Sequence, residues 1–201
     1  MFGLILQSAK NIEMTRCHLQ KGNFMAKEIL SRLSQEKIKK IRSSLLKEFS
    51  EYNISEAQVA RIVKEANISR GSFYTYFSDL FDAYNWILSQ VLTEVHQRKA
   101  EGSLNSAELL ILSAEDNEYF NFLRKYFEIN ESLLRVWNSK NHKSPDYNFV
   151  EHVLNEDETR KWVKDLITHE AIRQSFLHPE ERENIVLHLK AAEKLIGEKE
   201  V

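Results

Sequence analysis

The fold class that the sequence predicts is all-α, and three observations predict it. The 201 residues include only five glycines and two prolines, so few positions mark turns. Apolar residues recur at intervals of three and four, which is the spacing of one helix face, and strand-like alternation is scarce. Ser or Asn precedes several of these periodic segments, where its side chain can cap the first turn of a helix.

The composition is that of a globular protein with one large domain, or with a small domain and a larger one, since 42% of the residues are hydrophobic and 29% are charged. No stretch approaches the roughly eighteen apolar residues of a membrane span. The opening MFGLILQSAK lacks the basic start and apolar length of a secretory signal. We therefore expect a cytoplasmic protein without a membrane partner. Cys17 is the single cysteine and predicts neither a disulfide nor a metal site.

The first well-marked helix begins after Ser34, whose hydroxyl is placed to cap it. Its apolar face consists of Ile38, Ile41, Leu45, Leu46 and Phe49. Residues 1–30 have weak periodicity, and Met25 lies just ahead of this helix. We expect residues 1–30 to form an arm or extension. The sequence leaves open whether residues 1–24 belong to the native protein, because translation could instead begin at Met25. A genuine additional helix is the alternative.

The next helix covers about residues 55–66, and Ser55 and Gln58 stand three apart at its start, as in a capping box. Asn67 is expected to end it, because Asn tolerates a left-handed backbone. The helix after that covers about residues 70–77 and is capped by Ser69.

These two helices, joined at one tight corner, predict a helix-turn-helix. The second helix is barely two turns long and is expected to hide only Phe73 and Phe77. Its other face carries an arginine, hydroxyls and tyrosine rings, which is too polar for a core. We interpret it as a DNA-reading helix.

Ser78 is expected to cap a helix that continues to Gly102 and is long enough to link two domains. Beyond it we expect helices over about residues 104–114, 116–127, 129–138, 146–154 and 155–176, a loop at residues 139–145, and a last helix entered through Pro179. Asn155 and Glu158 form a second capping-box pattern.

The last two helices each carry an apolar stripe. Such stripes can pack within one chain or form a four-helix interface with a second copy, and the sequence leaves both uses open. The residues expected at a dimer interface are Trp162, Leu166, Ile185, Leu189, Ala192 and Leu195.

Charge is distributed unevenly along the chain. Residues 1–80 contain 13 Lys and Arg against 8 Asp and Glu, whereas residues 81–201 contain 15 against 22. A positive module at one end suits an attraction to phosphate, although uneven surface charge is also common.

The segment from Ile38 to Tyr84 resembles the DNA-binding domain of the tetracycline-repressor (TetR/AcrR) family of bacterial transcriptional regulators. The residues on that family's pattern are Phe49, Ile62, Ala66, Ile68, Ser69, Arg70, Gly71, Ser72, Phe73, Tyr74, Tyr76 and Phe77. The resemblance implies a three-helix DNA-binding domain over residues 31–80 and a helical regulatory, ligand-binding and dimerisation domain over residues 81–201. It also implies a homodimer that binds a palindromic operator in double-stranded DNA, and a repressor that a small-molecule effector releases.

Some positions depart from the family's pattern. Asn53 and Asn67 stand where the family usually has glycine, and Asn is the least costly substitute in a left-handed or tight backbone. Ala57 and Gln58 replace a hydroxyl pair, which removes a phosphate-bonding oxygen that Ser55 or Gln58 would have to replace.

A further departure is Leu80, which stands where a lysine commonly contacts phosphate. Each lost phosphate contact should weaken binding to DNA and flatten its dependence on salt.

The expected base reader is Arg70, whose planar fork can bond both acceptors of guanine; a phosphate contact or a solvated arginine is its alternative. Gly71 would let a phosphate approach closely, or is merely a permissive small residue. Ser72 and Thr75 are assigned to base edges. The residues assigned to phosphate contacts are Tyr74, Tyr76, Ser55, Gln58, Ser69, Lys39 and Lys40.

We expect no catalytic residue, cofactor or metal site. No two of the seven histidines stand at the i, i+4 spacing of a helical metal pair, and no GxSxG, phosphate loop or dinucleotide fingerprint occurs. Aromatic residues of the C-terminal half can line a ligand cavity, but rings at helical spacing are more often core.

The sequence therefore favours a dimeric DNA-binding transcriptional regulator, with a repressor as the expected type. The alternative, motivated by Ala57 and Leu80, is a protein of the same fold that has lost specific operator binding and acts through a protein partner.

Overall fold

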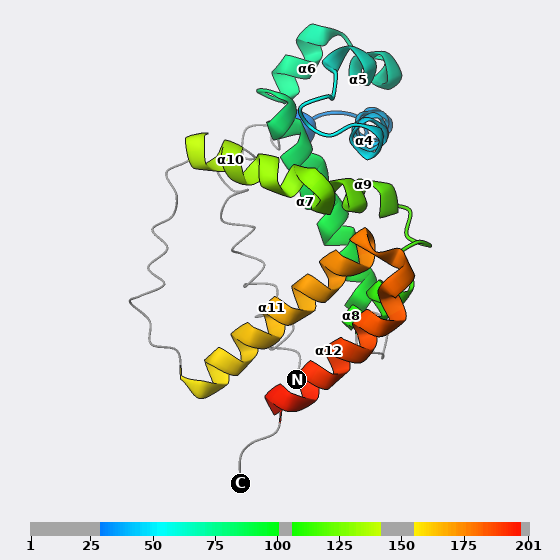
Figure 1. Cartoon of the computed structure of the whole chain (residues 1–201). Helices are drawn as coiled ribbons and strands as arrows, with labels where there is room; N and C mark the ends of the chain where they lie inside the picture. The colour runs from blue at the N-terminus through cyan, green and yellow to red at the C-terminus, as the bar shows by residue number, and fades with distance from the viewer. Residues whose placement is uncertain (1–28, 101–105, 142–154, 198–201) are drawn as a thin grey trace. The chain divides into compact units, whose positions relative to one another are not determined.

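The computed structural model describes residues 29–100, 106–141 and 155–197 (Figure 1). Every regular element in these ranges is helical, so the prediction of an all-α fold is confirmed. The described residues divide into two compact units, one of residues 29–94 and 129–141 and the other of residues 95–100, 106–128 and 155–197. Residues 1–28 of the expected arm, the helix expected over 146–154 and residues 142–145 of the expected loop lie outside the described residues. Residues 29–30 of the arm and 139–141 of the loop are helical.

The first unit begins with α4 (Gln35–Glu51), α5 (Val59–Ala66) and α6 (Arg70–Tyr76). Ser34 caps α4 by accepting a hydrogen bond from the Lys37 amide, and Ser69 caps α6 by accepting one from the Ser72 amide at 3.0 Å. Asn67 ends α5 in the left-handed conformation, with φ 52° and ψ 51°. These three predictions are confirmed.

The core of the first unit consists of apolar side chains from all three helices and from α7 (Leu80–Ala100). Phe49 of α4 meets the ring of Tyr84 of α7 edge to face, with centroids 4.8 Å apart. Phe77, directly after α6, packs against Trp86 of α7 with centroids 5.6 Å apart. Other large and fully buried members include Ile41, Leu45, Ile54, Ile62, Phe73 and Ile87.

The second unit contains α8 (Ser106–Leu112), α9 (Phe120–Lys125), α11 (Glu156–Leu177), the 3₁₀ turn η2 (Pro179–Glu181) and α12 (Arg182–Gly197). α11 and α12 lie side by side, joined through η2 (Figure 1). Together with α8 they enclose a core of Ala107, Ile111, Val186 and Leu189. The capping box predicted at the start of α11, between Asn155 and Glu158, is present.

Two predicted helix boundaries in this region are wrong. α9 begins at Phe120 rather than near residue 116, because the Asn117 side chain accepts a hydrogen bond from the Tyr119 amide at 2.9 Å and holds the preceding residues in turns. The break expected near residue 128 is absent. A π-helical turn, η1 (Tyr126–Asn130), joins α9 directly to α10 (Glu131–Asn141).

Asn130, the last residue of that π-turn, is fully buried in the first unit. Its side-chain oxygen accepts a hydrogen bond at 3.0 Å from the amide of Ile54, which lies in the corner between α4 and α5. A buried amide needs such an acceptor, because leaving it unpaired is costly. This contact joins residues 76 positions apart, and no local pattern in the sequence indicates it.

Among the described helices, none has the length and apolar character needed to cross a membrane.

Replacing Asn130 with alanine should lower the free energy of unfolding by about 1 to 3 kcal/mol, because the buried Ile54 amide loses its acceptor. Chemical denaturation of both proteins measures this difference. Asn184→Ala is the matched control, since Asn184 is exposed and bonds Glu181 on the surface; it should change stability by less than about 0.5 kcal/mol. Equal stability losses in the two variants would contradict the role given to Asn130.

Candidate nucleic-acid interface

The outer face of α6 is the polar surface that the sequence predicts. Arg70, Gly71, Tyr74 and Thr75 are exposed, and Ser72 is half-buried. Tyr74 is 49% exposed and rests edge to face on the buried ring of Phe73, with centroids 5.4 Å apart. α6 therefore offers one arginine, one tyrosine and a backbone without a side chain at Gly71 to a partner.

Tyr76 lies on the opposite face, so the expectation that α6 hides only Phe73 and Phe77 is wrong, while the phosphate contact assigned to the Tyr76 hydroxyl stays a prediction. Its side chain is only 7% exposed, and the ammonium of Lys37 lies over its ring, 5.7 Å from the centroid. The physical reason is spacing, because Tyr76 follows Phe73 by three residues and so shares its inward face. Phe73 and Phe77 are buried as predicted.

Arg70 and Gly71 stand in the first turn of α6. The Arg70 guanidinium lies 5.9 Å from the Tyr74 ring centroid, and in the described part of the chain no carboxylate forms an ion pair with it. A Cβ added at Gly71 would meet only the Ser69 hydroxyl, at 3.8 Å, which is an ordinary contact. Nothing within the described chain thus requires a glycine at this position.

The hydroxyls of Ser69, at the start of α6, and of Ser72 and Thr75, within it, are all hydrogen-bonded inside the chain. Thr75 donates to the Gly71 carbonyl at 3.0 Å, and the hydroxyls of Ser69 and Ser72 share a hydrogen bond at 2.9 Å. Each would have to add a second bond, or exchange its present one, to contact a nucleic acid.

The basic face of α4 is partly neutralised. Lys40 pairs with Glu36 at 2.7 Å, and Arg42 bonds both carboxylate oxygens of Glu94 at 2.8 and 2.9 Å. The Lys40 pair is exposed on both sides and so holds Lys40 weakly. Lys39 is exposed and has no ion pair with another described residue.

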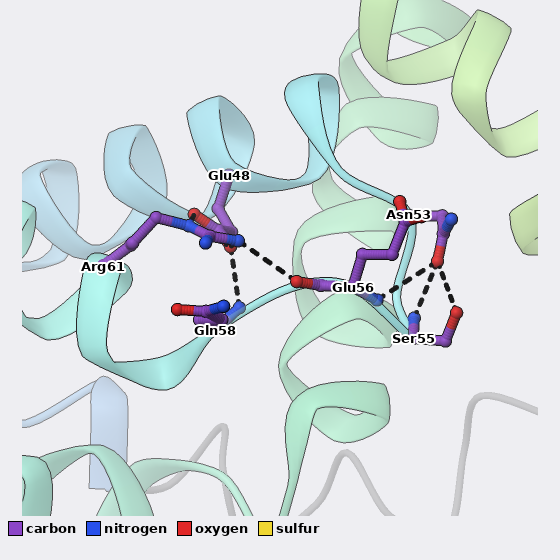
Figure 2. A network of polar contacts seen from close by, with 6 residues as sticks. All are labelled: Glu48, Asn53, Ser55, Glu56, Gln58 and Arg61. Carbon is purple, nitrogen blue, oxygen red and sulfur yellow. Dashed lines mark hydrogen bonds and ion pairs between the residues drawn. The ribbon is translucent and has the colours of Figure 1, made fainter.

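The corner before α5 differs from the prediction. The capping box expected between Ser55 and Gln58 is absent, and the helix begins at Val59 rather than near residue 55. Instead, the Asn53 side chain accepts hydrogen bonds from the Ser55 amide at 2.9 Å, the Ser55 hydroxyl at 2.6 Å and the Glu56 amide at 3.2 Å (Figure 2). Asn53 therefore makes a tight turn through its side chain and is not left-handed, since Asn67 is the non-glycine residue with positive φ in the described ranges.

The cap of α5 comes from α4. Glu48 is 5% exposed, and its carboxylate accepts a hydrogen bond from the Gln58 amide at 2.7 Å. The same carboxylate binds the guanidinium of Arg61 through two nitrogens, at 2.6 to 3.0 Å (Figure 2). Arg61 also donates to the Glu56 carbonyl at 3.1 Å and lies over the Tyr52 ring, 3.9 Å from its centroid. The carboxylate raises the pKa of Arg61.

The sequence reasoning missed Glu48 and Arg61, although one signal was available. Glu48 falls on the buried stripe of α4, seven residues after Ile41 and three after Leu45. A carboxylate on an apolar stripe requires a buried partner, and Arg61 in the first turn of the next helix is a suitable one.

α7 is capped one residue later than predicted. Asp79, rather than Ser78, accepts the hydrogen bond from the Asp82 amide, at 2.8 Å. Ser78 instead donates to the Asp82 carboxylate through its amide at 2.9 Å and its hydroxyl at 3.3 Å. Burial raises the pKa of Asp82, and the bonds from Ser78 offset part of this effect. Leu80, in the first turn, is half-buried.

The residues expected at a dimer interface separate into two groups. Trp162, Leu166 and Leu195 are exposed, and Leu195 is the most exposed at 73%. Ile185 and Ala192 are half-buried. Leu189 is only 2% exposed and belongs to the core of its own unit, which corrects its assignment to the surface.

No group of three or more His, Cys, Asp or Glu side chains is placed to hold a metal ion in the residues that the structure covers.

Comparison with known protein families identifies the middle of the first unit. Residues 41–79 match the family described as bacterial regulatory proteins, tetR family. This stretch contains most of α4, all of α5 and α6, and the Asp79 cap of α7. No curated protein matches the chain.

Replacing Asp82 with asparagine should change how stability depends on pH. Because its pKa is raised on folding, the stability that protonated Asp82 supplies is complete below the ordinary Asp pKa and is lost as pH rises through the raised value. Asn remains neutral, so the stability of Asp82→Asn relative to wild type should rise through this window. Denaturation at a series of pH values measures it, with exposed Asp116→Asn as the control. A constant difference across the window would contradict the effect.

Proposed function

We propose that this chain, which carries a TetR-family N-terminal helix-turn-helix domain over residues 41–79, is a dimeric transcriptional regulator that binds a palindromic operator. The observation that carries the proposal is the outer face of α6, where Arg70, Gly71, Tyr74 and Thr75 stand exposed on a helix whose inner face is fully buried. From here on, the three helices α4, α5 and α6 are called the head.

Arg70 is proposed as the base reader. Side chains in the first turn of a recognition helix point at the floor of the major groove, and a guanidinium can bond O6 and N7 of guanine together. Gly71 supports close approach of the DNA backbone, because its missing side chain has no use within the described chain. The exposed hydroxyl of Tyr74 and the ammonium of Lys39 suit phosphate oxygens.

Two heads are needed to bind a palindrome, at about 34 to 36 Å from each other. We place the dimer interface on α11 and α12, where Trp162, Leu166 and Leu195 are exposed apolar side chains. Two such helices from each copy can form a four-helix interface. Residues 31–80 then serve DNA binding, and residues 81–201 serve regulation and dimerisation.

The regulator is proposed to act in the cytoplasm as a repressor that a small molecule releases. An effector that binds the C-terminal domain would favour the dimer with the wrong spacing of heads. The loss of operator affinity equals the preference of the effector for that state.

A second candidate function is an adaptor that has lost specific operator binding and acts through a protein partner. It is favoured by the buried Ala57, the half-buried Leu80 and the carboxylate of Glu48 at the start of α5, which all reduce phosphate contacts. A gel-shift experiment with DNA flanking the protein's own gene separates the two. A sequence-selective, salt-sensitive band supports the regulator, and binding equal to that of random DNA supports the adaptor.

Arg70→Ala should weaken binding to the operator by about 1 to 3 kcal/mol and relax the preference at one base pair. Fluorescence anisotropy with the operator and with single-base variants measures both effects. Arg135→Ala on α10 is the matched control, because it removes an exposed arginine of the same unit outside the head. If Arg70→Ala leaves operator selection unchanged, Arg70 is not the base reader.

Leu166→Asp should convert the dimer to a monomer, because it places a charge in the proposed apolar interface. Sedimentation equilibrium gives the mass of each species. Leu109→Asp on α8 is the control, since it alters another exposed leucine of the same unit outside the proposed interface. A Leu166→Asp protein that remains dimeric would place the interface elsewhere.

A further inference from the structure

The amino end of α5 already holds an anion from its own chain. The first amides of a helix have no partner within the helix and carry a partial positive charge, so they attract anions. At α5 the Gln58 amide donates to the Glu48 carboxylate at 2.7 Å (Figure 2). The first turn of α5 contains no acidic residue of its own and contains the cation Arg61, and the Glu48 carboxylate is the anion that bonds both this cation and the Gln58 amide.

The cation of that first turn is also held within the chain. Arg61 binds Glu48 through two nitrogens and donates to the Glu56 carbonyl, while its guanidinium stacks over Tyr52. The Arg61 side chain is nevertheless 36% exposed, so it lies at the surface of the corner rather than in the core. Its position would allow a contact with an external phosphate if the carboxylate did not bind it.

The neighbouring donors are engaged as well. The Ser55 hydroxyl donates to Asn53 at 2.6 Å, and Ala57 is buried and has no side-chain donor. Gln58 makes no capping bond with its side chain and is exposed. Among the polar side chains described at this end of α5, the Gln58 carboxamide is therefore the one left to donate to an outside partner.

We propose that Glu48 takes the place of a DNA phosphate at the amino end of α5 and withholds Arg61 from DNA. The phosphate contacts of this end then fall to the Gln58 side chain, and α6 carries most of the affinity. Glu48 and Arg61 act as a positioning pair that joins α4 to α5 and at the same time limits nonspecific attraction to DNA. The inference rests on the proposed function, because it assumes that the head binds DNA.

Glu48→Gln tests the proposal. Glutamine keeps an oxygen that can accept from the Gln58 amide but removes the charge and releases Arg61. The variant should melt at a lower temperature, yet bind a random-sequence duplex several-fold more tightly at low salt. The slope of log affinity against log salt concentration should steepen by about 0.9 per head, as expected for one more neutralised phosphate. The double variant Glu48→Gln, Arg61→Gln should return the slope to the wild-type value.

A purely structural role for Glu48 gives the opposite result, with weaker binding and an unchanged slope, and would overturn the proposal. Glu65→Gln is the matched control. It makes the same change in charge and removes the partner of Lys47, which bonds Glu65 at 3.1 Å between the same two helices. Because Glu65 lies near the other end of α5, this variant should leave the slope unchanged. An equal steepening in the control would also overturn the proposal.

Amide hydrogen exchange of the wild-type protein provides a second measurement that does not depend on a variant. The Gln58 amide should exchange slowly in the free protein and remain unchanged when duplex is added, whereas the amides of α6 should slow. A Gln58 amide that becomes protected only with DNA would contradict the proposal.

If Glu48→Gln binds duplex and the wild type does not, the operator function fails while this inference is supported. If neither protein binds, both fail.

Discussion

The buried carboxylate of Glu48 is the interaction on which the geometry of the head depends. It accepts a hydrogen bond from the amide of Gln58, the residue directly before α5, and binds the guanidinium of Arg61 in the first turn, so one side chain of α4 holds the start of α5 against α4. A buried carboxylate without partners would be strongly destabilising, which makes this arrangement costly to change. α6 follows α5 after residues 67–69, of which Asn67 is left-handed, so the position of α6 depends on α5 and on this short turn.

A second buried contact supports the corner from elsewhere in the chain. Asn130 accepts the amide of Ile54 and thereby connects the π-turn between α9 and α10 with the start of the helix-turn-helix. That turn lies where the helical run passes from the second unit to the first. The corner before α5 is thus held by side chains from α4 and from η1, while the outer face of α6 makes few contacts within the chain. This contrast between a fixed corner and an open face is what a rigid recognition surface requires.

Much of the head and of α11 was predictable because the signals are local. Ser34, Ser69 and Asn155 bond amides three residues ahead, and Asn67 adopts a backbone conformation that few other residues tolerate. Such features depend on a few adjacent residues and are the same wherever the helix lies in the protein. The open face of α6 was predictable for a related reason, since a two-turn helix with only one apolar face has few ways to pack.

By itself, the sequence determined the helical class, most caps and the polar face of α6, because each follows from side chains within about one turn of each other. Only the tertiary structure decided that Glu48 caps α5, that Asn130 binds Ile54, and that Leu189 is buried. The physical reason is that helical periodicity identifies which residues share a face but contains no information on what packs against that face. Glu48 and Asn130 bond residues that lie 10 and 76 positions away along the chain, and only the folded arrangement brings those partners into contact.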